Sequence, residues 1–330
     1  DMSATVTTED LSCWVLSEGM AGTENQCLAL ADALGLTPVV KRAAMNKPWR
    51  WLGVVMAALP PRLLAQGYDS LAPPWPDLVI ASGRKCAGLA LAIQRASGGH
   101  TFTIFVQNPR LGSARFDLIV APRHDGIAGA NIFTTRGALS RVGPAGLKSA
   151  AAEFASTYAH LPRPLVACLI GGTSRRHRLT PADGRVLGAA LAKLAADTGG
   201  SLLITPSRRT PEPSFAALEV ALDGAPAYIW RRKGANPYFG FLAVADAILV
   251  TGDSVSMVSD ACSSGKPVHI LPVSGQRSAR FSRFFATLEA EGAVRPFSGK
   301  LESWDYDPLN DCSLAADEIR RRLEMRQKTK

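Results

Sequence analysis

Residues 247–272 read AILVTGDSVSMVSDACSSGKPVHILP and contain one complete structural unit. The apolar run 247–250 is typical of a buried strand, and the small polar residues 251–254 are typical of a turn. A short helical segment follows. Gly265 and Pro267 end it, and the apolar run 268–271 predicts the next strand. The stretch therefore predicts a β-α-β unit of a parallel sheet.

Polar side chains gather where the first of these strands ends. Thr251, Asp253, Ser254 and Ser256 follow the strand, and Asp260 lies one turn further along. In doubly wound sheets, ligands bind at the carboxyl ends of the strands. Hydroxyl groups and the N–H groups of a helix N-terminus suit phosphate and sugar oxygens. We expect such a ligand here, with Asp260 accepting hydrogen bonds from a ribose. The alternative for Asp260 is an exposed charge on a helix.

The same alternation of strand and helix extends over the whole chain. Apolar runs in the first half predict strands at residues 13–17, 39–41, 78–81, 101–106 and 118–121. After a linker with two prolines, further strands are predicted at residues 165–170, 201–205 and 227–230. Strands that alternate with helices predict an α/β fold with parallel sheets covered on both faces.

We expect two Rossmann-like parallel-sheet domains in tandem, with a cleft between them. The expected bounds are an N-terminal domain at residues 1–160, a C-terminal nucleotide-binding domain at 161–311, and a C-terminal helix and tail at 312–330 that packs back on the N-terminal domain. The linker is expected at residues 159–164 because two prolines interrupt the pattern there.

Composition narrows the classes of partner. The chain has 330 residues and a net charge of +9, which favours phosphorylated metabolites or anionic lipid. No nucleic-acid-binding motif is present, so we expect no nucleic-acid partner. The six cysteines form no CxxC pair, which predicts buried free thiols in a reducing compartment. The histidines lack metal-ligand spacing, so we expect no metal site and no cofactor. Oligomeric state stays open.

Targeting signals are not evident in the sequence. The N-terminal residues DMSATVTTED lack the basic and apolar pattern of a signal peptide. No apolar stretch reaches the roughly 20 residues that span a bilayer. We therefore expect a cytoplasmic protein, with peripheral contact to the inner face of an anionic membrane as an option. Residues 47–66 mix Trp49 and Trp51 with cations, which suits a membrane interface. The alternative is an amphipathic core helix ended by Pro60.

The loop after the first predicted strand, SEGMAGTENQ at residues 17–26, is rich in glycine. Gly19 and Gly22 permit a tight turn and a close approach of a ligand to the backbone. Glu24 and Glu18 are the nearby carboxylates that could act as a general base, and we expect Glu24 to do so. Glu24 is equally well explained as an acidic residue in the first turn of a helix. Besides Gly19 and Gly22, the candidates for contact with an acceptor in this half are Thr23, Asn25, Ser82, Gly83, Arg84, Gln107, Arg110, His124 and Asp125.

The second half carries three further polar loops after predicted strands. GGTSRRHRL at residues 171–179 combines glycines, hydroxyls and arginines, which suits a diphosphate. The alternative is an exposed basic loop. Arg209 follows the next strand, and the loop at residues 231–240 is placed to line a base or sugar pocket. The candidates for binding phosphate or nucleotide in these loops and the adjoining helix are Gly171, Gly172, Thr173, Ser174, Arg209, Asn236, Pro237, Tyr238 and Met257.

The order of these motifs resembles the two-domain GT-B glycosyltransferases, above all those that add N-acetylglucosamine to a lipid-linked muramyl peptide. In that resemblance, residues 171–174 correspond to the loop that binds the donor phosphate. Asp260, five residues before Gly265, corresponds to the acidic residue that holds the donor ribose, where the family usually has glutamate. The loop histidine of the peptidoglycan enzymes is not matched, because Thr23 occupies its position and Glu24 follows.

A longer resemblance is to the family named for the plant elongate-mitochondria fission protein, which has many bacterial members. The blocks SEGMAGTENQCLALADALG, QNPR, APRHDG, IGGTSRRHRL and TGDSVSMVSDACSSGKPV carry it and cover both halves. The two resemblances imply a glycosyltransferase that uses a nucleotide-diphosphate sugar, such as a UDP-sugar, without a metal. Its donor would bind the C-terminal half, and an unidentified acceptor would bind the N-terminal half. The alternative is an inactive relative that binds a nucleotide or a partner and acts in membrane remodelling. The sequence leaves open whether the chain is an enzyme.

Overall fold

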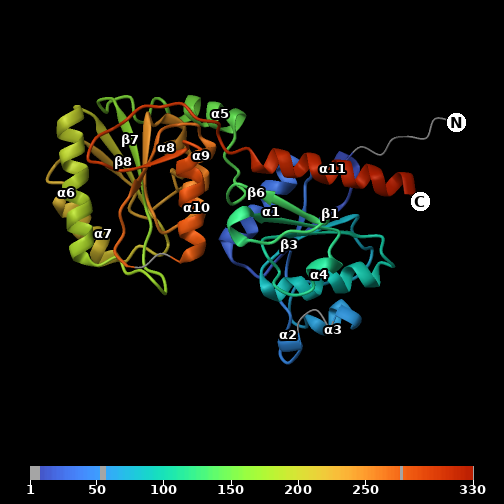
Figure 1. Ribbon diagram of the computed structural model, residues 1–330. Coiled ribbons are helices and arrows are strands. Elements are labelled where there is room, and N and C mark those ends of the chain that lie inside the picture. Colours follow the sequence, from blue (N-terminus) through green and yellow to red (C-terminus); the bar gives the residue numbers. More distant parts are fainter. Residues whose placement is uncertain (1–7, 53–56, 276–277, 330) are drawn as a thin grey trace. The chain divides into compact units, whose positions relative to one another are not determined.

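The computed structural model describes residues 8–52, 57–275 and 278–329, and they form two compact units (Figure 1). Unit 1 extends to Arg141 and includes the C-terminal segment from Asn310, and unit 2 is Val142–Leu309. The boundary therefore lies earlier than residue 160. Helix α5 (Pro144–Phe154) and Tyr158 belong to unit 2, where the Tyr158 ring lies 5.7 Å from the ring of Phe241.

Unit 1 is built on a six-stranded sheet in the order β2-β1-β3-β4-β5-β6, and every neighbouring pair is parallel. The strands are β1 (Cys13–Ser17), β2 (Val39–Arg42), β3 (Leu78–Ser82), β4 (Phe102–Val106), β5 (Leu118–Pro122) and β6 (Ile132–Thr135). The chain moves outward from β1 in both directions. The point at which the strand order reverses therefore lies between β1 and β3, where ligands bind in open sheets of this kind.

Helices cover both faces of this sheet. Strand residues such as Val15 and Ile80 are packed against α1 and α11 on one face, and their neighbours Leu16 and Ala81 against α4 on the other. This two-sided burial explains why the strands are continuous apolar runs. The helical segments of unit 1 are η1 (Thr8–Asp10), α1 (Ala21–Ala33), α2 (Trp49–Leu52), α3 (Pro61–Leu64), α4 (Arg84–Ala96), η3 (Ser113–Arg115), η4 (Arg123–Asp125) and α11 (Asp311–Thr329).

The C-terminal helix α11 is anchored to unit 1 at its first residue. The Asp311 carboxylate accepts hydrogen bonds from the backbone N–H groups of Arg136, at 3.0 Å, and Gly137, at 3.2 Å. Burial of this carboxyl raises its pKa, although these N–H groups oppose the shift. Ala315 and Ile319, one and two turns further on, are fully buried against the sheet. Helix α11 therefore completes the core of unit 1 from the far end of the chain.

Unit 2 contains a second parallel sheet of six strands, in the order β12-β11-β10-β7-β8-β9. Its strands are β7 (Leu165–Ile170), β8 (Ser201–Pro206), β9 (Ala227–Ile229), β10 (Ala247–Thr251), β11 (Val268–Leu271) and β12 (Val294–Pro296). This is the strand order of a dinucleotide-binding Rossmann fold. Because the first three strands run one way from β7 and the last three the other way, the reversal lies between β7 and β10.

Helices of unit 2 also cover both faces of its sheet (Figure 1). One layer is α6 (Pro181–Thr198) with α7 (Glu212–Ala221). The other is α8 (Tyr238–Val244), α9 (Val255–Ser263) and α10 (Ala279–Ala290). Glycine brings α6 and α7 close together, since a Cβ on Gly188 would lie 2.3 Å from the Leu218 carbonyl oxygen. Thr180 and Asp183 form a capping box that begins α6.

The two-domain α/β prediction is confirmed, and residues 247–272 form β10, α9 and β11 as expected. Residues 47–66 do not form the single core helix that was one interpretation, because the described residues 57–60 between the short helices α2 and α3 are not α-helical. Residues 53–56 lie outside the described part of the chain, and the membrane-interface interpretation stays a prediction. All six cysteines are free and five are buried, which raises the pKa of the Cys13 and Cys86 thiols to about 12. In the described ranges, no helix has the length and apolar character needed to cross a membrane.

Candidate functional site

The carboxyl edge of unit 2 holds a connected polar cluster at the strand reversal. The Thr251 hydroxyl accepts a hydrogen bond from the Gly171 N–H at 2.7 Å and donates one to the Asp253 carboxylate at 2.6 Å. The other oxygen of Asp253 accepts from the Gly172 N–H at 2.9 Å. These bonds join the end of β7 to the end of β10 directly across the reversal point.

The glycine pair at residues 171–172 makes room for this cluster. A Cβ on Gly171 would lie 2.2 Å from the Asp253 carboxylate oxygens, and a Cβ on Gly172 would lie 1.9 Å from the Arg209 carbonyl oxygen. No side chain fits either space. Glycine is therefore needed at both positions because other parts of the protein pack closely against the backbone there. Their sequence pattern also allows a second reason, the close approach of a ligand to the backbone.

The backbone of residues 171–174 is fully engaged inside the protein. Besides the two glycine N–H groups, the Thr173 N–H donates to the Arg209 carbonyl at 3.0 Å, and the Ser174 N–H donates to the His177 carbonyl at 2.7 Å. In this conformation, these four N–H groups are not available as a phosphate cradle. What the loop offers a ligand is its side chains, because Ser174 and the three neighbouring arginines at 175, 176 and 178 are exposed.

Arg209 is a cation that Asp253 holds beside the reversal point. Its Nη2 lies 3.2 Å from Asp253 Oδ2, and its side chain is 40% exposed whereas that of Asp253 is 3% exposed. Asp253 immediately precedes Ser254, the N-cap of α9, whose hydroxyl accepts from the Met257 N–H. The first N–H groups of a helix have no partner within the helix and carry partial positive charge. A guanidinium and a helix N-terminus therefore lie together at this edge.

Asp260 and Tyr238 form the next part of the same edge. The Tyr238 hydroxyl donates to Asp260 Oδ2 at 2.8 Å. Asp260, the residue predicted to bind the ribose, therefore already accepts one hydrogen bond from the protein. Burial, with the nearby Asp260 charge, raises the pKa of Tyr238 well above its usual range. The side-chain oxygen of Asn236 accepts from the Tyr238 N–H, and Pro237 is the N-cap of α8. Ser256 is exposed on the first turn of α9.

In unit 1, Glu24 lies in the first turn of α1 and is paired with the last residue of β2. Arg42 Nη2 lies 3.1 Å from Glu24 Oε1, and Arg42 Nε donates to Oε2 at 3.4 Å. The hydrogen bond from Arg42 lowers the pKa of Glu24. A carboxylate that already binds a guanidinium and has a lowered pKa is a weak proton acceptor. The geometry thus favours a structural role for Glu24 over the base that the sequence indicated.

Glu18 has a different environment at the end of β1. Its Oε2 is buried and has no hydrogen-bond partner within the described ranges. Gly83, with φ of +93° at the end of β3, lies against this carboxyl, since a Cβ on Gly83 would be 3.0 Å from Glu18 Cδ and Oε2. An unpaired buried oxygen is energetically unfavourable without a partner. Glu18 lies where the strand order reverses between β1 and β3, and its Oε2 is able to accept a hydrogen bond from a ligand hydroxyl.

The remaining candidates of unit 1 lie along the same carboxyl edge. Gln107, after β4, has φ of +81°, which is unusual for a residue with a side chain and is typical of functional loops. Arg110 also has positive φ, and its N–H donates to Asn108. After β5, His124 Nε2 lies 3.9 Å from Asp125 Oδ1, and the two side chains are 2% and 6% exposed. That distance is too long for a hydrogen bond.

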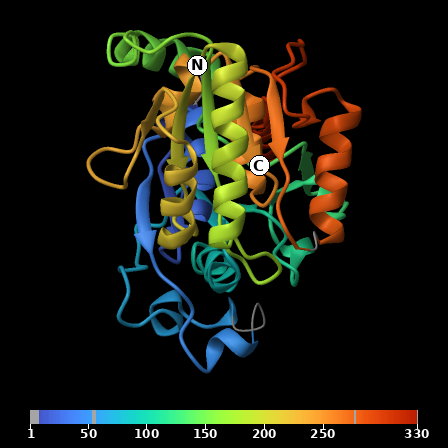
Figure 2. The same cartoon turned by 90° about the vertical axis from the view of Figure 1, so that its left-hand side faces the viewer.

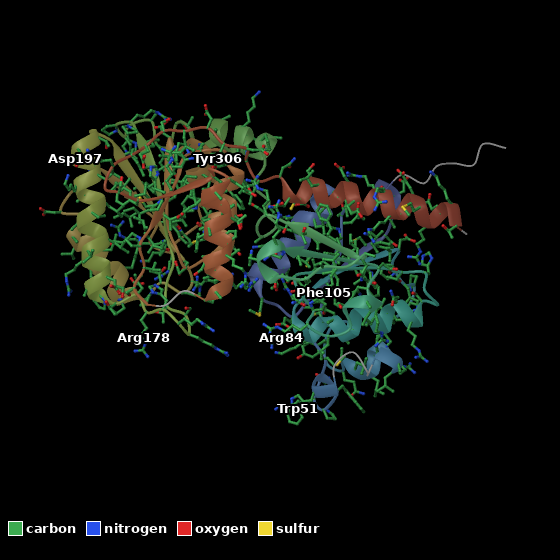
Figure 3. The ribbon with its side chains drawn as sticks, viewed as in Figure 1. Trp51, Arg84, Phe105, Arg178, Asp197 and Tyr306 are labelled. Carbon is green, nitrogen blue, oxygen red and sulfur yellow. The ribbon has the colours of Figure 1, made fainter. Side chains whose placement is uncertain are left out.

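Other predicted residues sit at helix starts or strand ends. The Gly19 N–H donates to the Ser17 hydroxyl, and the Thr23 hydroxyl donates to the Met20 carbonyl at the start of α1. Gly22 and Asn25 are exposed on α1. The Ser82 hydroxyl donates to the Val106 carbonyl between β3 and β4. Arg84 begins α4 (Figure 3). In the described ranges, no group of three or more His, Cys, Asp or Glu side chains is placed to hold a metal ion.

Residues 21–323 match the family described as Mitochondrial fission ELM1. The chain belongs to this family. The Arabidopsis thaliana relative, described as mitochondrial fission protein ELM1, is 30% identical to this ELM1-family chain, and the match covers 94% of this chain and 91% of that protein. A Rickettsia prowazekii relative, described as uncharacterized protein RP120, is 26% identical over 96% of this chain and 99% of that protein.

Two solved structures share the fold of this ELM1-family chain. The UDP-GlcNAc 2-epimerase from Methanocaldococcus jannaschii has a TM-score of 0.57 and 13% identity, over 95% of this chain and 99% of that one. Arabidopsis thaliana UGT89C1, complexed with UDP, has a TM-score of 0.52 and 13% identity, over 94% of this chain and 89% of that one. The chain therefore has the GT-B fold class, and identities this low establish the fold alone.

The structure brings together the predicted residues Gly171, Gly172, Thr251, Asp253 and Arg209 of unit 2. It also joins Tyr238 to Asp260, which the sequence had assigned to a loop and to a helix, respectively. One residue of the carboxyl edges was missed: Thr210, whose hydroxyl donates to the Gly171 carbonyl at 2.7 Å. Glu18 was considered as a base, but Glu24 was preferred to it. The contact between Glu18 and Gly83 could be found only once β1 and β3 were known to be neighbours.

Proposed function

We propose that unit 2 binds a nucleoside diphosphate, as part of a nucleotide sugar, at its carboxyl edge between β7 and β10. The observation that carries this proposal is the Arg209 guanidinium, which Asp253 holds directly beside the N-terminus of α9. A cation next to a helix N-terminus is suited to the two phosphates of such a ligand. The same two groups would stabilise the charge that develops on a diphosphate leaving group, without a metal ion.

The ribose would bind further along α9. A carboxylate can accept about four hydrogen bonds in total, so the bond from Tyr238 does not by itself prevent Asp260 from accepting one from a ribose hydroxyl. The hydrogen bond from Tyr238 also fixes the orientation of the Asp260 side chain, which preorganises it for that contact. UDP is the first nucleotide to test, because two proteins of the same fold are a UDP-GlcNAc 2-epimerase and a glycosyltransferase-fold protein complexed with UDP.

The reaction that follows from this ligand is transfer of the sugar to a hydroxyl of an acceptor. The acceptor oxygen forms a bond to the anomeric carbon, the bond from that carbon to the diphosphate breaks, and the hydroxyl proton passes to a base. We assign the base to Glu18 instead of Glu24, because Glu18 Oε2 has no hydrogen-bond partner among the described residues and Glu24 is occupied by Arg42. The acceptor is unidentified.

The test is a thermal-shift screen with UDP-, GDP-, ADP- and CMP-sugars, followed by an assay of hydrolysis of any sugar that stabilises the protein. We expect one nucleotide class to raise the melting temperature. Glu18→Gln should then abolish turnover with nucleotide binding retained, whereas Glu24→Gln should leave some turnover. If none of the nucleotide sugars stabilises the protein, the proposal fails.

A second candidate is an ELM1-family protein that binds a nucleotide or a protein partner without turnover and acts in membrane remodelling. Its specific support is the engagement of all four N–H groups of residues 171–174 within the protein, together with the family's description as mitochondrial fission. Nucleotide binding with no hydrolysis or transfer, unchanged by Glu18→Gln, would favour this candidate over the transferase.

A further inference from the structure

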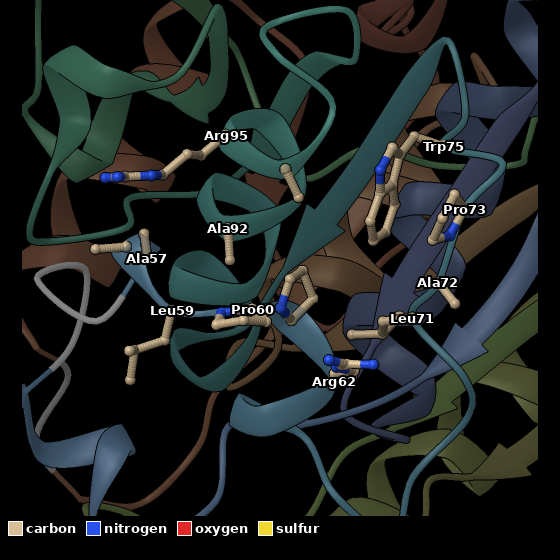
Figure 4. A pocket seen from close by; sticks show the side chains of 13 residues that line it. Ala57, Leu59, Pro60, Arg62, Leu71, Ala72, Pro73, Trp75, Ala92 and Arg95 are labelled. Atoms are coloured by element: carbon tan, nitrogen blue, oxygen red, sulfur yellow. The ribbon is translucent and has the colours of Figure 1, made fainter.

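Unit 1 contains a pocket of about 400 Å³ that is lined by none of the candidate site residues described above (Figure 4). It is bounded by α3, by the C-terminal end of α4 and by the chain that leads into β3. Its size is within the range of small-ligand sites, roughly 300–1,000 Å³. Because α4 runs back from the carboxyl edge of the sheet and Trp75 precedes β3, the pocket lies at the amino edge, away from Glu18.

The wall of this pocket is apolar. Apart from two arginines, its lining consists of alanine, leucine, proline and tryptophan, among them Leu59, Leu71, Trp75 and Ala92. A bound peptide would place backbone N–H and C=O groups against a wall that offers almost no partners, which is energetically costly. A hydrocarbon chain has no such groups. The chemistry of the wall therefore favours an acyl chain over a peptide.

Two arginines flank the apolar wall. Arg62 on α3 and Arg95 on α4 extend from opposite sides of the pocket (Figure 4). Both residues are exposed, and neither guanidinium forms an ion pair or a hydrogen bond with another residue of the described ranges. Arginine binds phosphate by two parallel hydrogen bonds. Unpaired guanidinium groups at the rim of an apolar pocket complement a ligand that has an anionic head and a hydrocarbon tail.

The surface around the pocket has the composition of a membrane interface. Helices α2 and α3 lie on the same side of α4 in both ribbon views (Figures 1 and 2). On α2, the Trp51 side chain points away from α4 (Figure 3), and the residue is 74% exposed. Lys47 Nζ lies 5.9 Å from its ring centre. Leu63 on α3 is 37% exposed. Tryptophan beside a cation is favoured at the level of lipid headgroups.

We propose that the α3–α4 pocket binds an acyl chain of an anionic phospholipid at a membrane surface, with the lipid phosphate held by Arg62 and Arg95. Trp51 and Leu63 would enter the headgroup layer beside the pocket. This contact is peripheral and needs no membrane-spanning helix. It is independent of the proposed nucleotide site, which lies in unit 2, so either proposal can fail without the other.

The first test measures binding of the full chain to vesicles by co-sedimentation. Vesicles of phosphatidylglycerol mixed with phosphatidylcholine should bind the protein, and vesicles of phosphatidylcholine alone should bind it weakly. Arg62→Gln and Arg95→Gln should each lower the partition coefficient about fivefold, and the double variant about 25-fold. The matched control is the double variant Arg185→Gln with Lys148→Gln. It removes the same charge from exposed helix positions in unit 2 and should change binding less than twofold.

The second test locates the acyl chain. Phosphatidylglycerol with brominated acyl chains quenches tryptophan that touches the chain, so Trp75 fluorescence should fall on binding, and this part of the quenching should disappear in Trp75→Phe. Ala58 lines the pocket and is exposed, so Ala58→Trp fills the space without entering the core. It should lower vesicle binding while the melting temperature stays unchanged. Ala72→Trp serves the same purpose if Ala58→Trp lowers that temperature.

Three results would overturn the proposal. One is absence of binding to anionic vesicles. Another is an equal loss of binding in the Arg62/Arg95 and Arg185/Lys148 double variants, which would mean that net charge alone attracts the protein. The third is quenching that is the same in wild type and Trp75→Phe, which would place the lipid contact at Trp51 and leave the pocket empty.

Discussion

Asp253 and Arg209 form an ion pair in which the two partners have different roles. Substituting each residue in turn distinguishes the structural role of Asp253 from the ligand-binding role of Arg209. The Asp253 carboxylate is almost completely buried and accepts hydrogen bonds from Gly172 at 2.9 Å and Thr251 at 2.6 Å, which hold β7 to β10. Arg209 is 40% exposed and bonds to the same carboxylate at 3.2 Å. We predict that Asp253→Asn destabilises this edge strongly, and that Arg209→Gln does so weakly while weakening nucleotide binding.

The magnitudes follow from the geometry. Hydrogen bonds to a buried charge contribute about 1.5–3 kcal/mol each. Asp253→Asn removes the charge and misplaces at least one acceptor, so we expect a loss of about 2–4 kcal/mol. That corresponds to a rise of roughly 30- to 1,000-fold in the exchange rate of the protected amides of β7. The guanidinium of Arg209 is half-exposed, and Asp253 keeps its hydrogen bonds from Gly172 and Thr251 when Arg209 is removed. We therefore expect the ion pair to contribute less than about 1 kcal/mol, and Arg209→Gln to raise that rate less than about fivefold.

The assay is hydrogen exchange of peptides that span residues 165–172, followed by mass spectrometry. Peptides from β4 in unit 1 serve as an internal control, because neither substitution touches them. A double-variant cycle then gives the coupling between the two residues. If Arg209→Gln accelerated exchange as much as Asp253→Asn, Arg209 would be a structural partner of Asp253, and its proposed role as a phosphate ligand would lose its support.

Three further predictions test other parts of the structure. Gly83→Ala should lower stability by about 1–3 kcal/mol, measured by urea unfolding, because φ of +93° disfavours a side chain and its Cβ would meet Glu18 at 3.0 Å; an unchanged midpoint would contradict this geometry. Burial lowers the pKa of Lys266 to about 8 from 10.5, so the folded state holds its proton less tightly than the unfolded state. The melting temperature of wild type should therefore rise relative to that of Lys266→Met as the pH increases from about 8 to 10.5. The Arg321 and Arg322 guanidinium groups lower the pKa of Glu318 to about 2 from 4.5. The stabilisation relative to Glu318→Gln should be complete above pH 4.5 and disappear as the pH falls towards 2, measured by exchange protection of α11.

The sequence was sufficient to predict the strands and helices of the core. It was insufficient to predict which polar residues at the ends of those strands contact one another. The apolar runs that became β7 and β10 were identified because strands buried on both faces are nearly continuous runs of apolar residues. That these two strands are neighbours follows from the strand order alone. Without that order, the glycine pair at 171–172 could be explained either by close packing within the protein or by the close approach of a ligand. The position of the Asp253 carboxylate decides between these explanations.

Unit 1 shows the same limit in its candidate base. Glu24 was identified as a candidate base in a glycine-rich loop, but the structure places it in the first turn of α1, which was the alternative explanation for this residue. Its partner Arg42 ends β2, and β2 is placed beside β1 by the sheet and not by any local pattern. The partners of Asp311 could not be predicted from local sequence either, because the backbone N–H groups that it binds belong to residues 136 and 137, which are remote in sequence. Long-range pairing of this kind decides which polar residues stay available for a ligand.

The central claim is that Arg209 and the N-terminus of α9 bind a nucleoside diphosphate. Calorimetric titration of UDP, GDP and ADP into the full chain tests it most directly, with Arg209→Gln and the exposed control Arg185→Gln titrated in parallel. We expect one binding site for at least one of these nucleotides. Arg209→Gln should lower the affinity about 10- to 100-fold, and Arg185→Gln should leave the affinity unchanged. Absence of heat with all three nucleotides, or equal affinity of wild type and Arg209→Gln, would contradict it.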